Sequence, residues 1–93
     1  MKDLDPLLHN QLRLAIMSLL ATHEEITFTF IVDKTGATRG NISVQISKLE
    51  EAGYLSVKKE FIDRRPHTSM SITEGGLQAM DIYTKTLKEY LNL

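Results

Sequence analysis

The sequence contains no cysteine among its 93 residues, which excludes disulfide bonds and thiolate metal sites. It also has no long apolar stretch, since the longest uncharged run, Leu14 to His23, is far shorter than the roughly 20 apolar residues of a membrane span. The amino-terminal residues lack the apolar core of a signal peptide. We therefore expect a soluble, cytoplasmic protein, and its length is that of one domain, residues 1–93.

Arrangements of side chains that typically carry catalysis or bind a metal are also missing. The three histidines lie far apart, in an expected helix (His9), a loop (His23) and a hairpin (His67), so a joint metal site is not expected. No serine sits in a recognisable nucleophile elbow, and Gly75-Gly76 lacks the pattern of a phosphate-binding loop. We predict that the protein is not an enzyme and uses no metal or other cofactor.

The net charge of −1 argues against nucleic-acid binding when it is taken alone, but the charges are unevenly distributed. Between Thr38 and Lys48 there are two bases and no acid, and between Lys58 and His67 four bases accompany two acids. These two segments together carry +4, and the rest of the chain carries −5. This asymmetry predicts a basic face on an otherwise acidic body, which is typical of a nucleic-acid-binding domain.

Hydrophobic periodicity predicts two helices in the first third of the chain. The first begins at Asp5-Pro6, with Asp5 as the N-cap and proline at the first helical position, and runs to about Ala21. The second has Thr27 as its candidate N-cap and ends after about two turns at Gly36, where glycine suits a left-handed backbone. Residues 26–28 form either a short strand or only the extended lead into this helix.

A third helix is expected from its N-cap Thr38 to Ala52, closed by Gly53. One apolar stripe runs along it, at the spacing i, i+4 and i+7: Ile42, Ile46 and Leu49. The opposite side carries mostly short hydrogen-bonding side chains of poor helix propensity, where Glu and Lys would normally serve stability. These side chains are Arg39, Asn41, Ser43, Val44, Gln45, Ser47 and Lys48. Their composition indicates selection for something other than helix stability.

After Gly53 the apolar period changes to two, which predicts a β-hairpin. The strands are Tyr54–Ile62 and Thr68–Ile72, joined by a turn over Asp63–His67. Their expected inward residues are Leu55 and Val57, with Phe61 as a further candidate, and then Met70 and Ile72. Thr73 then caps a last helix that continues to the carboxyl end.

This order of elements predicts an α+β fold that is mostly α, a winged helix-turn-helix. It consists of a three-helix core, a wing sheet of two or three strands and a C-terminal dimerisation helix. The second helix of the helix-turn-helix faces outward as the recognition helix, and the basic hairpin forms a wing beside it. The major groove of DNA admits an α-helix, and each base pair presents a distinct pattern of donors and acceptors there.

Four segments of the sequence resemble MarR/ArsR-type winged-helix regulators. Residues 38–43 (Thr-Arg-Gly-Asn-Ile-Ser) and 48–55 (Lys-Leu-Glu-Glu-Ala-Gly-Tyr-Leu) are similar to their recognition helix and the start of the following strand. Residues 63–68 (Asp-Arg-Arg-Pro-His-Thr) and 72–76 (Ile-Thr-Glu-Gly-Gly) resemble the wing and the final helix start of a short MarR-like group. The resemblance covers essentially Leu4 to Leu91 and implies homodimers, a helix in the major groove and wing arginines at the minor groove or its phosphates.

The resemblance assigns DNA contacts to Thr38, Arg39, Asn41, Ser43, Val44, Gln45 and Lys48 in the helix, and to Arg64 and Arg65 in the wing. To these we add neighbouring polar and basic residues of the same segments: Ser47, Lys58, Lys59, His67 and Thr68. The chain departs from these families in two ways. It is shorter than full-length MarR proteins, whose more extensive dimerisation helices help to form an effector pocket. It also has no cysteine, whereas ArsR-type metal sensors often carry cysteines in their regulatory sites.

Both ends of the chain carry more apolar side chains than contacts within so small a core would use. We expect them to form a two-fold dimer interface whose residues are Leu4, Leu7, Leu77, Met80, Tyr83, Leu87, Tyr90 and Leu91. The expected function is that of a double-stranded DNA-binding transcriptional regulator that recognises an inverted repeat. Two alternatives remain open: a winged-helix module that binds a protein partner, and a regulator with a small-molecule pocket between the first and last helices at the dimer interface.

Overall fold

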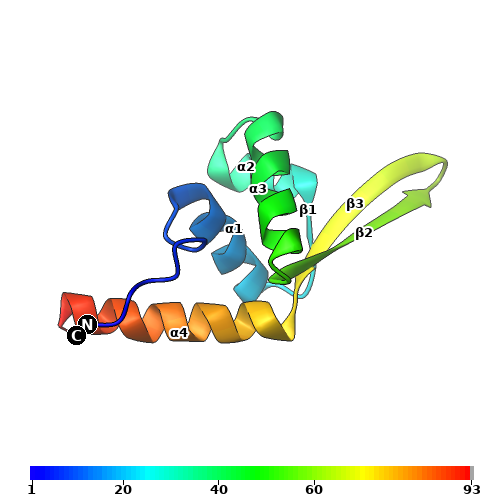
Figure 1. Ribbon diagram of the computed structural model, residues 1–93. Coiled ribbons are helices and arrows are strands. Elements are labelled where there is room, and N and C mark those ends of the chain that lie inside the picture. Colours follow the sequence, from blue (N-terminus) through cyan, green and yellow to red (C-terminus); the bar gives the residue numbers. More distant parts are fainter. Residues whose placement is uncertain (93) are drawn as a thin grey trace.

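The computed structural model describes residues 1–92, and within them four helices accompany a three-stranded antiparallel sheet. In chain order the elements are α1 (Gln11–Thr22), β1 (Ile26–Thr27), α2 (Phe28–Thr35), α3 (Arg39–Glu51), β2 (Leu55–Ile62), β3 (Arg65–Ile72) and α4 (Glu74–Leu91). In Figure 1, α1, α2 and α3 form a body on one side of α4, and the β2–β3 hairpin projects from one end of it. The amino-terminal segment lies at the other end of α4. The predicted winged-helix fold class is confirmed.

Threonine hydroxyls cap three of the helices, as the sequence predicted. Thr27 accepts a hydrogen bond from the N–H of Phe30, and Thr38 accepts one from the N–H of Asn41. Thr73 caps α4 in the same way by accepting from the N–H of Gly76. These hydroxyls accept from N–H groups that a helix leaves without an internal partner. Each of the three helices therefore begins at the residue that follows its threonine.

The predicted start of the first helix is wrong. α1 begins at Gln11, because Asn10 is its N-cap and accepts a hydrogen bond from the N–H of Arg13. Asp5 instead closes a separate turn, in which its side chain accepts from the N–H of Leu7 over 2.9 Å. Its other carboxylate oxygen accepts a hydrogen bond from the hydroxyl of Tyr54 over 2.5 Å. The Asp5 carboxylate, which was predicted to cap the first helix, therefore binds Leu7 and the distant Tyr54 instead.

The wing is longer and has a tighter turn than the sequence predicted. β2 and β3 pair from Leu55 opposite Ile72 to Ile62 opposite Arg65, so β3 begins three residues earlier than expected. Only Asp63 and Arg64 form the turn, with φ angles of 51° and 65°. Two positive φ angles are typical of a type I′ turn, whose twist matches that of a hairpin.

Two further details of the sheet resolve or correct expectations. The residues before α2 do form a short strand, since Ile26 pairs with Met70 and Thr27 with Ser69. Phe61 was a candidate for the core, but 78% of its surface is exposed. It shares a strand face with Val57, yet it lies near the end of the hairpin, where no helix of its own chain covers the sheet.

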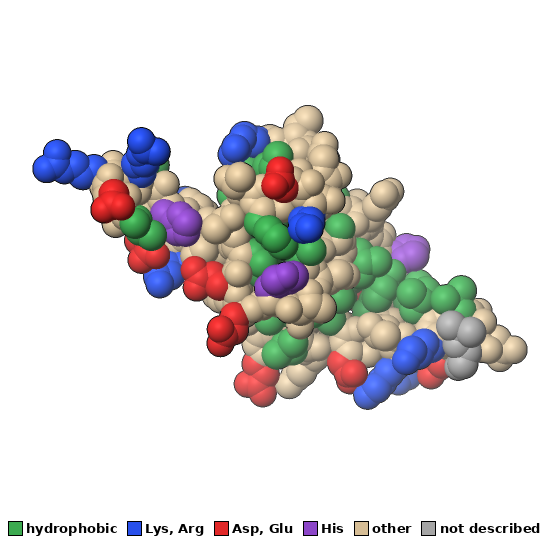
Figure 2. Space-filling model, turned by 180° about the vertical axis from the view of Figure 1, so that it is seen from behind, with side chains coloured by type: hydrophobic (Ala, Val, Ile, Leu, Met, Phe, Trp, Pro, Cys, Tyr) green, Lys and Arg blue, Asp and Glu red, His purple; other side chains and the backbone are tan. Residues whose placement is uncertain are grey.

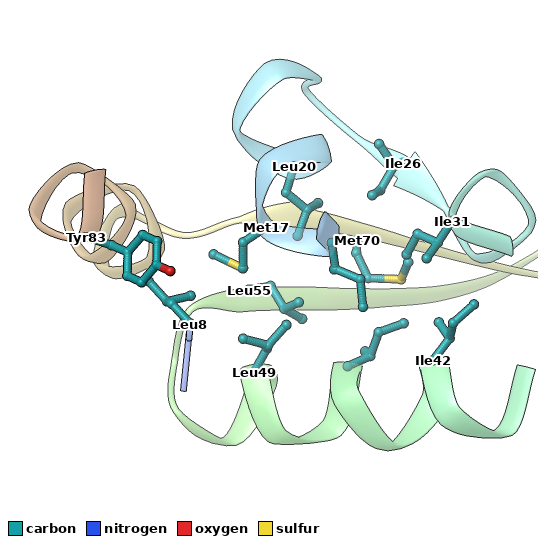
Figure 3. Packing of buried hydrophobic residues seen from close by; sticks show 12 residues of the cluster. Leu8, Met17, Leu20, Ile26, Ile31, Ile42, Leu49, Leu55, Met70 and Tyr83 are labelled. Carbon is teal, nitrogen blue, oxygen red and sulfur yellow. The ribbon is translucent and has the colours of Figure 1, made fainter. Parts of the chain in front are cut away.

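The hydrophobic core lies between α1, α3 and the sheet. Ile42 and Leu49 of α3 point toward Met17 and Leu20 of α1 and toward Met70 of β3 (Figure 3). Burying a large aliphatic side chain contributes about 1.5–3 kcal/mol, so these contacts hold α3 firmly by one side. No helix in residues 1–92 has the length and apolar composition needed to cross a membrane.

The beginning of α4 is packed tightly against the base of the wing. Thr73 donates two hydrogen bonds, one from its hydroxyl to the carbonyl of Gly53 and one from its N–H to the carbonyl of Tyr54. A Cβ atom at Gly76 would lie 2.0 Å from that same carbonyl oxygen of Tyr54, so only glycine allows this approach. The wing and α4 are therefore held in a fixed relation at this point.

Because of the Tyr54–Asp5 hydrogen bond, the free energy of unfolding should decrease with rising pH in the alkaline range. The bond, together with partial burial, raises the pKa of Tyr54 to about 12. This value lies above the unfolded pKa of about 10. The hydrogen bond therefore makes its full contribution to the free energy of unfolding below pH 10, and this contribution is lost as pH rises through 12. We predict that Tyr54→Phe lowers the unfolding free energy by about 1–2 kcal/mol at pH 7, and by less at pH 11. Urea denaturation at both pH values measures this, and a difference that stays the same at pH 11 would contradict it.

Candidate nucleic-acid interface

The outward face of α3 is determined by the side that it buries. Successive residues turn by about 100° around a helix, so burial of Ile42, Ile46 and Leu49 leaves Val44 near the centre of the opposite side. The Val44 side chain is 52% exposed. The other predicted contact residues of the helix are exposed too, apart from the half-buried Gln45: Thr38, Arg39, Asn41, Ser43, Ser47 and Lys48.

On the flank of α3 that faces α1, three polar side chains are linked. Arg13 of α1 donates from Nη1 to Oε1 of Gln45 over 2.6 Å, and Gln45 donates from Nε2 to Oδ1 of Asn41 over 2.9 Å. Arg13 also donates from Nε to the carbonyl of Leu7 over 2.5 Å. Arg13 is not among the residues predicted from the sequence to be functional. No local pattern marks it, because it lies in the first helix and reaches α3 only through the fold.

On the other flank, α3 faces the wing across a groove of about 340 Å³. Ser43 and Ser47 of α3 line it, with Lys59 and Thr68 from the hairpin. Glu50, an acid that was not assigned to the interface, lines it as well. Helix and wing are therefore brought together as predicted, with one carboxylate between them.

The amino-terminal end of α3 meets the wing at a second groove, of about 540 Å³, which Arg39 and His67 line together. The guanidinium of Arg39 stacks over the ring of Phe28, 5.5 Å from its centre. Such a cation–π contact fixes the direction of the side chain while leaving its donors free. Thr38, by contrast, uses its hydroxyl as the N-cap of α3.

The remaining wing residues lie along the hairpin that projects from the body. Arg64 and Arg65 are exposed at or beside its turn, and in Figure 2 basic side chains lie at this end of the molecule together with acidic ones. Lys58 lies on the other sheet face from Lys59 and forms an exposed ion pair with Glu60, with 3.7 Å between its Nζ and Oε2. Phe61 and Ile62 are exposed beside the turn, which the sequence did not predict.

Gly40 also lies on the outward face, although it is not among the residues predicted from the sequence to contact DNA. Its φ angle is not positive, and a Cβ atom built on it would meet nothing within 4 Å. The fold therefore does not require glycine here, although glycine costs up to about 1 kcal/mol relative to alanine in a helix. A bare backbone at this position favours close approach of a partner to the start of α3.

The last helix keeps an apolar flank that its own core covers only in part. Leu77 and Leu91 are 49% and 59% exposed, and Met80 and Leu87 between them are half-buried. With Thr84, these positions alternate spacings of three and four residues, as in the seam of a coiled coil. Figure 2 shows hydrophobic side chains gathered along this end of the molecule.

Six of the residues assigned to a dimer interface make contacts within their own chain, and Met80 and Leu87 are two of them, since both pack against the core. Tyr83 is buried in the core, so its assignment to an exposed interface is corrected, and its hydroxyl lies 3.1 Å from Nδ1 of His9. Tyr90 donates a hydrogen bond to the carbonyl of Lys2. Leu4 and Leu7 are half-buried against the core of their own chain. The long α4 holds the amino-terminal segment through these contacts.

One more groove, of about 830 Å³, lies between α1, the α2–α3 turn and the flank of α3 that carries Asn41 and Gln45. It is therefore not located between the first and last helices, where the ligand-sensor alternative places its pocket. Among the described residues, no group of three His, Asp or Glu side chains could hold a metal ion.

The order of elements, the outward α3 and the hairpin beside it define a winged helix-turn-helix protein. The family described as winged helix DNA-binding domain matches residues 12–91, and the chain belongs to this family. The family is one of DNA-binding domains and not of enzymes, as the sequence predicted.

Individual proteins resemble this chain in sequence or in structure. The protein MJ0432 of Methanocaldococcus jannaschii is 35% identical over 71 residues, which make up 76% of this chain and 77% of that protein. A transcriptional regulator homologue from Pyrococcus horikoshii OT3 has a similar structure, with a TM-score of 0.86, 30% identity and coverage of 92% and 85% of the two chains. The MarR family regulator NMB1585 from Neisseria meningitidis shares the fold, with a TM-score of 0.68 and 24% identity; the match covers 89% of this chain and 58% of that one. The winged-helix family that the resemblance predicted is confirmed, and the likeness to a MarR family regulator is one of fold.

Gly40→Ala should separate stability from DNA binding. We predict that it raises the unfolding free energy by up to about 1 kcal/mol, because alanine favours the helix. It should nevertheless weaken duplex binding, because the added methyl group projects from the outward face. Urea denaturation and a fluorescence-anisotropy titration with duplex DNA measure the two effects. Gln78→Ala, on an exposed position of α4, is the matched control, and unchanged or tighter DNA binding by Gly40→Ala would contradict the prediction.

Proposed function

We propose that this protein is a sequence-specific, homodimeric transcriptional regulator that binds double-stranded DNA. In this proposal α3 lies in the major groove, and the wing reaches the adjacent minor groove or its phosphates. The observation that carries the proposal is the outward face of α3, which is polar, exposed and flanked by the basic hairpin. Membership of a DNA-binding family supports the same partner.

The chemistry of α3 suits the reading of base edges. Asn41, Ser43, Gln45 and Ser47 offer amide and hydroxyl groups that can hydrogen-bond base edges or phosphates. Val44, at the centre of the face, presents methyl groups of the kind that contact the 5-methyl group of thymine. Arg39 lies near the helix start, where it can pair with guanine or with a phosphate.

The charge distribution suits a duplex despite the net charge of −1. Arg39 and Lys48 lie on α3 and Arg64 and Arg65 at the wing turn, all exposed, whereas Glu50 is the one acid in the groove between helix and wing. Lysine and arginine at phosphates release counterions, so DNA affinity falls steeply with salt. A protein partner bound through an apolar contact would show only a mild salt dependence, which distinguishes that alternative.

Selection of bound sequences from random duplex DNA, followed by anisotropy titrations of the selected and a random duplex, tests the proposal. Val44→Ala with Ser47→Ala should cost about 1–3 kcal/mol on the selected duplex for each base that these side chains read, and little on the random one. Arg64→Asn with Arg65→Gln should weaken binding to both duplexes and reduce the salt slope by up to about two. Asparagine suits position 64 because it tolerates the positive φ angle there.

Equal losses on both duplexes for the α3 variant would show that this helix only positions the protein on the backbone. An unchanged salt slope for the wing variant would leave its arginines as solvated turn residues. Failure of the native protein to enrich any sequence, or to bind duplex DNA in a salt-dependent way, would overturn the proposed function itself.

The apolar seam of α4 supports a dimer in which α4 of one copy packs against α4 of the other. Two-fold pairing would cover Leu77 and Leu91, which otherwise expose large apolar surfaces to water. It would also place two recognition helices for one inverted repeat, with half-site centres about 10 base pairs apart. Tethering two half-site contacts in one particle raises the affinity without any new contact to DNA.

Charges in the seam should separate the dimer. Leu77→Glu with Leu91→Glu should yield monomers in sedimentation at micromolar concentration, with much weaker binding to the inverted repeat, because two half-sites no longer share one association step. Both side chains are already exposed, so the fold should persist. Ile82→Glu is the matched control, since Ile82 is 61% exposed on a different side of α4. A native protein that sediments as a monomer and binds one half-site with full affinity would contradict this prediction.

A further inference from the structure

The hydrogen bonds between Arg13, Gln45 and Asn41 determine which way the two amide groups point. A guanidinium group has donors only, so the atom of Gln45 that meets Nη1 of Arg13 must be the carbonyl oxygen. The Gln45 nitrogen is then the atom that meets Asn41, and the atom of Asn41 that accepts from it must be an oxygen. One donor in α1 therefore sets the orientation of both amides in α3.

Arg13 itself is held in position by the chain that precedes α1. Its Nε donates to the carbonyl of Leu7. Leu7 is itself held by Asp5, whose carboxylate accepts from the N–H of Leu7 and from the hydroxyl of Tyr54. Arg13 is half-buried, and its guanidinium reaches Gln45 while fixed at a second point. The arrangement is more rigid than a single surface hydrogen bond, because both the donor and its target have defined partners.

The orientation has a consequence for base reading. The oxygen of Asn41 accepts from Gln45 and keeps one lone pair, whereas the NH₂ group of Asn41 keeps both of its N–H donors, so this exposed residue meets a partner mainly as a donor. Gln45 keeps one N–H beyond the one given to Asn41. A free Asn or Gln reads adenine by using its oxygen and nitrogen together, whereas a group that only donates matches the N7 and O6 acceptors of guanine.

We propose that Arg13 is a specificity-determining positioning residue, which holds Asn41 and Gln45 as donors and so favours guanine over adenine at the base that Asn41 reads. This inference rests on the proposed DNA-binding function and deepens it. Arg13 acts through the two amides and makes no base contact of its own.

Arg13→Met tests the proposal, because it removes the donors and keeps an unbranched side chain. We expect the preference for guanine over adenine at one position of each half-site to fall about fivefold or more. Affinity for random duplex and its salt slope should stay unchanged. Arg13→Lys, which retains a donor, should keep part of the preference. Circular dichroism and thermal unfolding verify that the variants are folded.

Gln45→Glu provides a second variant with an opposite expectation. The introduced carboxylate can accept from Arg13 but cannot donate to Asn41, so Asn41 must turn its NH₂ group inward and its oxygen outward. The preference at that base should move from guanine toward the bases that present a donor, which are cytosine and adenine. Charge repulsion lowers affinity on every sequence, but it does not by itself change which base is preferred.

The outcomes separate this inference from the function on which it rests. A native protein that selects a sequence, with Arg13→Met selecting the same one at equal strength, overturns the role of Arg13 and leaves the proposed function intact. A uniform loss of affinity with a flatter salt slope shows that Arg13 contacts phosphate directly, which also overturns it. A native protein that selects no sequence overturns both.

Discussion

Burial of the inner stripe of α3 is the constraint on which the rest of the structure depends. Ile42, Ile46 and Leu49 are fixed against α1 and the sheet, and this contact determines which residues of the helix face outward. The outward residues then contribute little to stability, so their short polar side chains are free to serve recognition. A different register of this packing would bury Val44 and expose the core, because a helix has only one apolar stripe here.

The ten residues before α1 connect α4 with α3, the two helices to which a function is proposed. Tyr90 and Tyr83 of α4 contact Lys2 and His9, while the Leu7 carbonyl holds the arginine that reaches α3. The seam proposed for the dimer and the proposed recognition face are therefore joined through this segment as well as through the wing base at Gly76. A change in how α4 packs has a direct structural route to the amides of α3.

The sequence was sufficient to predict the fold because its signals are local. Threonine caps, Gly36 and the change of period after Gly53 each act within a few residues, and the structure follows them. The errors came from the arrangement of distant segments: the Asp5 carboxylate accepts from Tyr54, Tyr83 packs into the core, and Phe61 lies on the hairpin beyond the reach of the helices. Arg13 could not be identified for the same reason, since its partner Gln45 is 32 residues away.

The central claim is that the outer face of α3 and the wing turn contact DNA while the α4 seam does not. Titration of ¹⁵N-labelled protein with the selected duplex, followed by amide chemical shifts, tests it most directly. The account predicts the largest shifts over residues 39–48 and 63–67, and small ones at Leu77 and Leu91. Shifts concentrated on α4, with α3 unaffected, would contradict it.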